Sequence, residues 1–320
     1  MPAFYTHYHF AKKLYHQMDK TFQDSIDINY YLYFAQSFDI LFYDYGFKKS
    51  NKLTKKVGHM GHYKNTQAFF LNTINLTKKS TNPIHLKYFK SFLYGFLTHY
   101  ILDAKFHPYI FYKTGTFKKT LNTNKYNGLH TKIELLIDKY FYEQENNQKY
   151  HKAKLYKLYD NIEEPNFLNQ FIENVFYKTF YKKDIGKKYL KLHKKWRLVT
   201  KCVKNDPYKI KLLIYKIYDL CSPKLKTKIK YYSNAYEDNS YDFLNNKHNK
   251  WFNPADNNIS SYSNIDDLFN ESLKQGKKLF QQVEQLFDKD IRTLNFPIAN
   301  ISYFSGLDLH LNKKLKFFEF

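Results

Sequence analysis

The residues best suited to chemistry in this chain lie on two stretches at four-residue spacing. His99, Asp103 and His107 form the first stretch, and His130 and Glu134 form the second. A four-residue step on an α-helix returns the side chain to nearly the same face, so each stretch predicts one stripe of imidazoles and carboxylates. Apolar residues wrap the first helix almost all round, which predicts that its stripe is buried. Because buried charge needs a partner, the pattern indicates a metal cluster.

The mixture of imidazole and carboxylate ligands favours zinc. Zn²⁺ accepts nitrogen and oxygen ligands, and three protein ligands leave a position open for water. A close pair of such ions can clamp the attacking and leaving oxygens of a phosphoester displacement. The competing di-iron interpretation requires Glu-x-x-His pairs. The sequence contains no such pair, so di-iron is disfavoured.

Further candidate ligands precede the two stripes. Thr6 is followed by His7, Asp39 lies in the segment Ser-Phe-Asp-Ile-Leu-Phe-Tyr-Asp, and His62 ends the segment Gly-His-Met-Gly-His. Together with the HxxxD, the following His and the HxxxE, this ordered set resembles the zinc-dependent phospholipase C family. That family shares its helical fold with single-strand nucleases of the S1/P1 type. The likeness covers roughly the first 140 residues.

The resemblance implies eight metal ligands in three groups. Asp39, His62, His99 and Asp103 would hold one zinc ion, and His107, His130 and Glu134 would hold a second. Asp103 would also bridge to a third ion, held by His7 and, in the family, by the amino and carbonyl groups of the N-terminal residue. Met1 stands only six residues before His7, a shorter segment than the family's enzymes carry, so two or three ions are expected. The family's carboxylate at the position of Asp39 also acts as general base, which implies the same catalytic role here.

Two of these assignments have rivals in the sequence. His59 lies three residues before His62, so the two side chains share a helix face and either is a candidate ligand. Asp44 competes with Asp39, and the order of the motif favours Asp39. Asp138, four residues beyond Glu134, extends the second stripe, but a helix cap or a lysine partner explains it equally well.

The elements that must position these residues are helices nearly throughout, and period-2 alternation is scarce, so a β-sheet is not expected. The expected fold is an all-α, multi-helix bundle resembling the phospholipase C fold. We predict helices at about 6–18, 27–43, 55–76, 84–112, 129–148, 168–181, 187–204, 207–220 and 268–290. Residues 1–150 would form the metal-binding core and 151–320 a helical continuation within one compact domain, with an Asn/Ser-rich loop at about 232–264.

The net charge of +23 invites a nucleic-acid or anionic-membrane interpretation. Arg197 and Arg292 are the only arginines, however, and the lysines are scattered among abundant Asn, Tyr, Phe and Ile. This residue set is typical of an A/T-rich genome, and arginine is the residue usually chosen for base contacts. Nucleic acid is therefore the less favoured partner, and peripheral contact with an anionic membrane is retained as an expectation.

No secretory signal is recognised at the N-terminus, and the longest apolar stretch carries too many ionisable residues to span a membrane. The expected location is therefore the cytoplasm. Cys202 and Cys221 are the only cysteines, and ordinary free thiols are expected.

Three functions remain open from the sequence. The first is a zinc-dependent phosphodiester hydrolase resembling phospholipase C, acting through a metal-activated water on a phosphoester such as a phospholipid head group. The second is a nuclease on single-stranded nucleic acid, because the same metal cluster serves both chemistries. The third is a metal-binding helical domain without turnover. The oligomeric state is left open.

Overall fold

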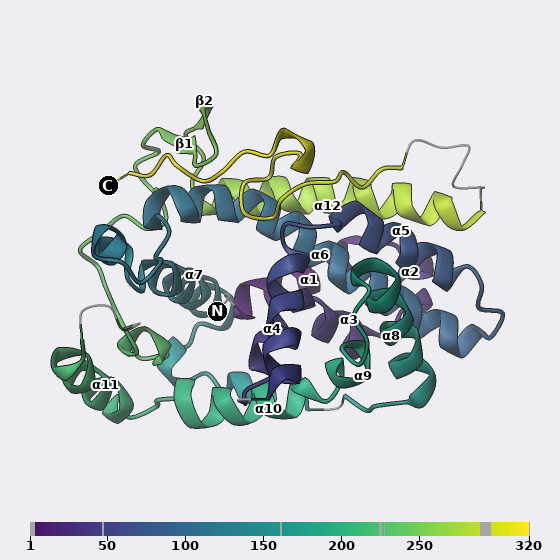
Figure 1. The fold of residues 1–320 in the computed structure, drawn as a ribbon, viewed down its shortest axis with the longest axis horizontal. Coiled ribbons are helices and arrows are strands. Elements are labelled where there is room, and N and C mark those ends of the chain that lie inside the picture. Colours follow the sequence, from purple (N-terminus) through teal and green to yellow (C-terminus); the bar gives the residue numbers. More distant parts are fainter. Residues whose placement is uncertain are drawn as a thin grey trace.

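The computed structural model describes residues 4–46, 48–160, 162–223, 226, 228–288 and 296–319. The fold is all-α, as predicted, with one short β-hairpin (Figure 1). The α-helices of these ranges are α1 (Phe4–Gln17), α2 (Lys20–Ser25), α3 (Ile28–Phe34), α4 (Lys49–Gly61), α5 (Thr66–Thr77), α6 (Pro83–Thr114), α7 (Leu129–Asn146), α8 (Asn166–Phe180), α9 (Gly186–Tyr189), α10 (Leu192–Val199), α11 (Ile210–Cys221) and α12 (Ile265–Asp288). Shorter 3₁₀ segments include η1 (Ser37–Tyr43), and a π-helical turn, η5, spans Thr200–Lys204.

Helix α6 is the central element of the bundle. The side chain of Asn82 accepts hydrogen bonds from the first free N–H groups, Pro83 occupies the first turn, and Gly115 (φ 58°) ends the helix. Most of the helix is buried, because α1, α3, α5, α7, α8 and α12 all pack against it. This explains the nearly continuous apolar sequence of α6, and it means that polar residues on this helix lie inside the protein.

A proline lies within α6 beside the candidate ligands. Pro108 has no N–H group, so the carbonyl of Ala104 loses its usual partner within the helix. The C-terminal segment packs against this point. A Cβ on Gly306 (φ 67°) would lie 2.6 Å from the Ala104 carbonyl oxygen, so only glycine fits there. This close approach holds residues near the end of the chain against the middle of α6.

Several predicted helices are divided in the structure. The expected helix 55–76 consists of α4 and α5, separated at Asn65, which adopts a left-handed conformation (φ 57°). The expected helix 187–204 consists of α9, α10 and the π-helical turn. Residues 289–290, predicted to end the last helix, lie outside the described ranges.

The segment expected to be an Asn/Ser-rich loop, at about 232–264, contains one short hairpin, although no β-sheet was expected. Strands β1 (Trp251–Asn253) and β2 (Asp256–Ser261) form an antiparallel hairpin. Trp251 is buried against Tyr109 of α6, with ring centroids 5.4 Å apart, and this contact anchors the hairpin.

One contiguous hydrophobic core includes residues from Phe4 to Tyr303. The division of the chain into a metal-binding core (1–150) and a helical continuation (151–320) stays a prediction. Among the described helices, none combines the length and the apolarity that crossing a bilayer requires.

Candidate metal centre

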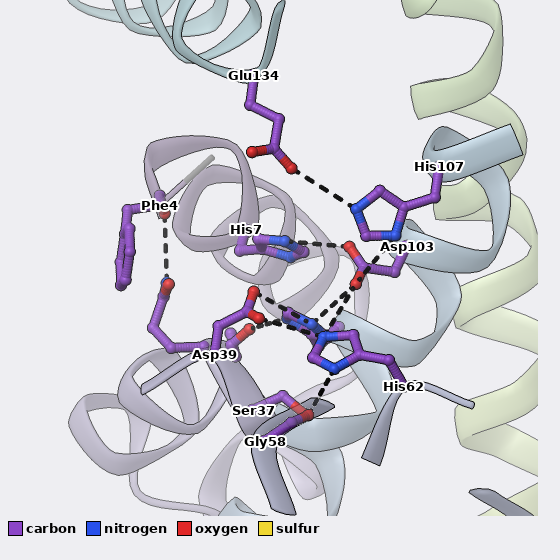
Figure 2. A network of polar contacts seen from close by, with 12 residues as sticks. Phe4, His7, Ser37, Asp39, Gly58, His62, Asp103, His107 and Glu134 are labelled. Carbon is purple, nitrogen blue, oxygen red and sulfur yellow. Dashed lines mark hydrogen bonds and ion pairs between the residues drawn. The ribbon is translucent and has the colours of Figure 1, made fainter. Parts of the chain in front are cut away.

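Five elements converge on one buried cluster of imidazoles and carboxylates (Figure 2). The eight predicted ligands are placed by α1 (His7), η1 (Asp39), the C-terminal end of α4 (His62), α6 (His99, Asp103, His107) and α7 (His130, Glu134). All of them are buried except His130, which is partly exposed. His7 and Asp103, which lie far apart in the sequence, are therefore neighbours in space.

The first group of ligand atoms belongs to His7, Asp39, His99 and Asp103. One atom from each lies within 4.8 Å of the other three, a spacing that fits a single ion. Asp103 Oδ1 is 3.3 Å from His7 Nε2, and Asp103 Oδ2 is 3.0 Å from His99 Nε2. His62 borders this group, because its Nε2 atom is 3.1 Å from Asp39 Oδ1 and 3.7 Å from Asp103 Oδ2. The spacing therefore places His7 inside the group to which the resemblance assigned His62.

The second group is His107, His130 and Glu134, whose ligand atoms also lie within 4.8 Å of one another. Glu134 Oε1 is 2.9 Å from His130 Nε2 and 3.6 Å from His107 Nε2. The other nitrogen of His107, Nδ1, is 3.5 Å from Asp103 Oδ2. His107 and Asp103 thus connect the two groups, as adjacent metal positions would require.

Backbone carbonyls orient two of the imidazoles. His62 Nδ1 is 2.8 Å from the carbonyl oxygen of Gly58, and His99 Nδ1 is 3.0 Å from that of Ala35. A carbonyl can only accept a hydrogen bond, so each Nδ1 carries the hydrogen in these contacts. In the neutral ring Nε2 is then the atom without a hydrogen, and it faces the carboxylates, which is the tautomer that a metal ligand needs.

Glycine allows α4 to reach the cluster. A Cβ on Gly61 would lie 2.3 Å from the ring of Phe38, the residue immediately before Asp39. Since real side chains never approach so closely, only glycine lets the end of α4 pack directly on η1. The contact brings His62 and Asp39 together, and explains why a glycine precedes that histidine.

Asp138 holds the helix that carries His7. Its carboxylate accepts hydrogen bonds from the backbone N–H groups of Tyr5 (3.1 Å) and Thr6 (2.8 Å). The hydroxyl groups of Thr6 (2.7 Å) and Tyr150 (3.2 Å) donate to the same carboxylate. Of the explanations open from the sequence, the cap is the one that the structure shows: Asp138 caps the N-terminus of α1 from α7.

Burial and the neighbouring histidines shift the pKa values of the carboxylates in opposite directions. Burial alone would raise the pKa of Asp103, but His107 and His99 hold it well below its usual range. Burial likewise opposes ionisation of Glu134, and His130 and His107 outweigh it, so the pKa of Glu134 is lowered. Both side chains are therefore anionic, the form that binds a cation.

Burial and the neighbouring carboxylates also shift the pKa values of the imidazoles. Burial opposes protonation of His62, yet Asp39 beside it raises the pKa of the ring. Burial also opposes protonation of His107, but its carboxylate neighbours, Asp103 first, raise the pKa to about 9. For His99 burial prevails, and its pKa is lowered. Without a metal, protons thus supply part of the positive charge in this site.

Unsatisfied polar atoms show that the cluster fits a metal. Within the described part of the chain, buried atoms without a hydrogen-bond partner include His7 Nδ1, Asp39 Oδ2, His99 Nε2, Asp103 Oδ2, His107 Nδ1, His130 Nδ1 and Glu134 Oε2. Such atoms are rare inside proteins and costly when they stay unpaired. Their concentration in one place, together with the nitrogen and oxygen donor set, matches what zinc requires.

A pocket of about 240 Å³ leads to the cluster. Its lining consists of Asp39, Phe42, His59, His62, His107, Phe111, His130, Glu134 and Phe304. His59 lies at this lining beside Phe42, with ring centroids 4.6 Å apart, whereas His62 reaches the carboxylates. Asp44 lies outside the pocket and pairs with Lys195 at 2.6 Å. The structure therefore places Asp39 and His62 in the cluster and their two rivals outside it.

Phe304 is a pocket residue that no sequence pattern indicated. The N–H of Tyr303 donates to the carbonyl of His62 at 2.8 Å, which fixes this part of the C-terminal segment. The ring of Phe304 then lies nearly parallel to His62, with centroids 5.8 Å apart, and 5.5 Å from Phe111. An isolated phenylalanine in an unrelated segment carries no periodic signal, so only the fold reveals this position.

Lys204 is a second residue that the sequence did not single out. Its ammonium nitrogen lies 5.0 Å from the ring centroid of Phe4 at the start of α1. Burial lowers the pKa of Lys204, although Asp138, Glu134 and Asp39 act in the opposite sense. Within the described ranges its ammonium forms no ion pair.

Comparison with known proteins agrees with this geometry. No curated protein and no solved structure gives a significant match. Residues 6–186 match the model of the family described as zinc dependent phospholipase C, and this segment contains all eight predicted ligands. The matched segment exceeds half of the 320 residues. The chain belongs to the zinc-dependent phospholipase C family.

Proposed function

We propose that this protein is a zinc-dependent phosphodiester hydrolase of the phospholipase C type. The observation that carries the proposal is the pair of adjacent ligand groups connected by Asp103 and His107 at the base of a pocket. Two neighbouring metal positions are the arrangement used to displace one oxygen of a phosphate ester by another. Membership of a zinc-dependent family supports the choice of metal.

The proposed ligands are the eight residues of the cluster. His7, Asp39, His62, His99 and Asp103 would serve the first group, and His107, His130 and Glu134 the second. A third ion would need His7 together with groups at the N-terminus, and residues 1–3 lie outside the described ranges. We therefore propose two ions, with a third as an extension.

Zinc, when bound, would polarise a phosphoryl oxygen and acidify water at neutral pH. The chain itself supplies the remaining functions. Asp39 lines the pocket and its Oδ2 atom has no hydrogen-bond partner, so this carboxylate could accept a proton there. Phe42, Phe111 and Phe304 form an apolar wall that limits water around the reacting phosphate.

The charge of Lys204 would complement the phosphate. When protonated, Lys204 would interact favourably with an anion, as it does with Asp138, Glu134 and Asp39, and would lower the cost of bringing a phosphate into the same region. We assign Lys204 an electrostatic role and not a ligand role. The phospholipid head group is the preferred substrate class, on the basis of family membership.

The test combines metal analysis with hydrolysis assays. Purified protein should contain at least two zinc equivalents, and it should hydrolyse a soluble aryl phosphodiester and a phospholipid. Asp39→Asn should lower turnover by a factor of at least about 100, because it removes the base and weakens a ligand. Asp44→Asn is the matched control: Asp44 is also buried, but its partners are Lys195, Lys188 and Asn51 and no cluster residue, so zinc content and turnover should be retained.

Three results would count against the proposal. Fewer than two zinc equivalents would contradict the metal arrangement. Absence of any turnover sensitive to Asp39→Asn would favour a metal-binding domain without catalysis. Hydrolysis of single-stranded DNA in preference to phospholipid would favour the nuclease alternative.

A further inference from the structure

Helix α11 exposes an apolar face that no other described element covers. Five aliphatic side chains on this short helix are more than half exposed: Ile210 (60%), Leu213 (61%), Ile214 (56%), Ile217 (54%) and Leu220 (86%). Their spacing of three and four residues puts them on one side of the helix. Contiguous apolar surface of this kind usually marks an interaction site, because it is costly to leave in water.

The opposite side of α11 attaches the helix to the protein. Leu212 and Asp219 are its buried residues, and Tyr215 donates a hydrogen bond to the carbonyl of Val203 at 3.1 Å. Asp206 accepts hydrogen bonds from the N–H groups of Lys211 and Leu212 at the start of the helix. The helix is therefore fixed with its apolar face outward, and it lies at the periphery of the bundle (Figure 1).

The surroundings of this face are strongly basic. Residues 201–230 contain nine lysines and only two acidic residues, Asp206 and Asp219. Both aspartates are buried and bind backbone N–H groups, so neither compensates the surface charge. Lys211 and Lys216 lie along the two borders of the apolar face, since they are offset from its centre by about 100–120° in opposite directions. The ammonium of Lys211 also donates hydrogen bonds to the carbonyls of Lys201 and Asn205, so Lys216 is the freer of the two. An apolar stripe between lysines is typical of helices that lie in the interface of an anionic membrane.

We propose that α11 is a membrane-docking helix that binds the surface of bilayers containing anionic phospholipids. Its aliphatic side chains would enter the boundary between head groups and acyl chains, and the flanking lysines would contact lipid phosphates. The helix lies beyond residues 6–186, the segment that matches the family. The inference rests on the proposed phospholipase activity in one respect, because docking would bring the metal pocket to a lipid substrate.

Charge argues against a second copy of the chain as the occupant. A symmetric dimer would place the same patch on both sides of the interface, so the lysines of one copy would face those of the other. Like charges brought together in this way destabilise the contact, whereas an anionic bilayer neutralises them.

The test measures vesicle binding of the full-length protein by co-sedimentation at near-physiological salt. Wild-type protein should bind phosphatidylcholine vesicles that contain phosphatidylserine more tightly than vesicles of phosphatidylcholine alone. The double variant Ile214→Ser/Ile217→Ser should bind the anionic vesicles at least about tenfold more weakly, because the apolar contribution is lost while the charge is unchanged. Ile84→Ser/Leu121→Ser is the matched control, since both residues are exposed aliphatics on other elements.

The proposal is overturned if the α11 variant binds as the wild type does, if the control variant loses binding equally, or if wild-type protein does not distinguish the two vesicle types. Light scattering that shows a dimer dissociating in the α11 variant would also overturn it, in favour of self-association. Zinc content and hydrolysis of a soluble phosphodiester are measured on the same samples and should be unchanged. Since vesicle binding requires no turnover, failure of the proposed hydrolase activity is distinguishable from failure of docking.

Discussion

A single carboxylate organises the candidate metal centre. Asp103 Oδ1 faces His7, while Oδ2 lies 3.0 Å from His99 Nε2 and 3.5 Å from His107 Nδ1. Four-residue steps on α6 place His99 and His107 one turn before and one turn after Asp103. The residue therefore contacts both ligand groups, a position that suits a carboxylate shared between neighbouring ions.

Asp138 is not assigned as a metal ligand, but it caps the helix that carries the ligand His7, and this role can be tested by substitution. Asp138→Asn should lower the free energy of unfolding by about 1–3 kcal/mol, since the amide group turns a donor toward the N–H groups of Tyr5 and Thr6. Chemical denaturation measures the effect. In the matched control Asp24→Asn, an exposed ion pair with Lys20 is lost, and the change should stay below about 1 kcal/mol. Equal effects in the two variants would contradict the capping role.

At the scale of elements, the junction between α4 and η1 determines whether His62 meets Asp39. Gly61→Ala should cost about 1–3 kcal/mol of stability and lower zinc affinity, because the added methyl group overlaps the Phe38 ring. Thermal denaturation and zinc titration measure the two effects. In a double-mutant cycle with Phe38→Leu, the combined loss of stability should be smaller than the sum of the two single losses. Strict additivity would show that the contact does not constrain the helix.

The sequence predicted most helices but not their interruptions. The long apolar run of α6 and its signals at Pro83 and Gly115 are local, so its limits were found within two residues. The break between α4 and α5 occurs at Asn65, where a left-handed residue redirects the chain. An asparagine tolerates that conformation, but nothing in the local sequence requires it. The break depends on tertiary packing, which a local pattern does not contain.

At the scale of the whole molecule, the ordered histidines and carboxylates could be read from the sequence because their residue types are chemically distinctive. The residues that contact and support these ligands could not be predicted from the sequence. Phe304 reaches the pocket through a hydrogen bond between Tyr303 and His62, and the segment between these residues spans most of the chain. Lys204 approaches the site from a segment with many similar lysines. Ordinary residue types at long sequence separation give no signal until the fold brings them together.

Metal removal tests the whole molecule, because the cluster joins five elements and several of its buried ligand atoms have no hydrogen-bond partner. Chelation should lower the melting temperature by on the order of 5–10 °C, the result expected when a ligand contributing about 4 kcal/mol is withdrawn from a chain of this size. The effect should also depend on pH. Protonated His107, with its pKa raised from 6.5 to about 9, stabilises the metal-free fold at low pH. That contribution is complete below about pH 6.5 and is lost as the pH rises through about 9.

Zinc requires the unprotonated ring of His107, so proton and metal compete for the same side chain. The difference in melting temperature between zinc-loaded and chelated protein should therefore be larger at about pH 8.5 than at about pH 6. The raised pKa of His62 acts in the same direction. His310→Gln, a substitution at an exposed position away from the cluster, should leave this pH dependence unchanged. A difference that is constant between the two pH values, or that decreases toward alkaline pH, would show that these imidazoles do not exchange a proton for the metal.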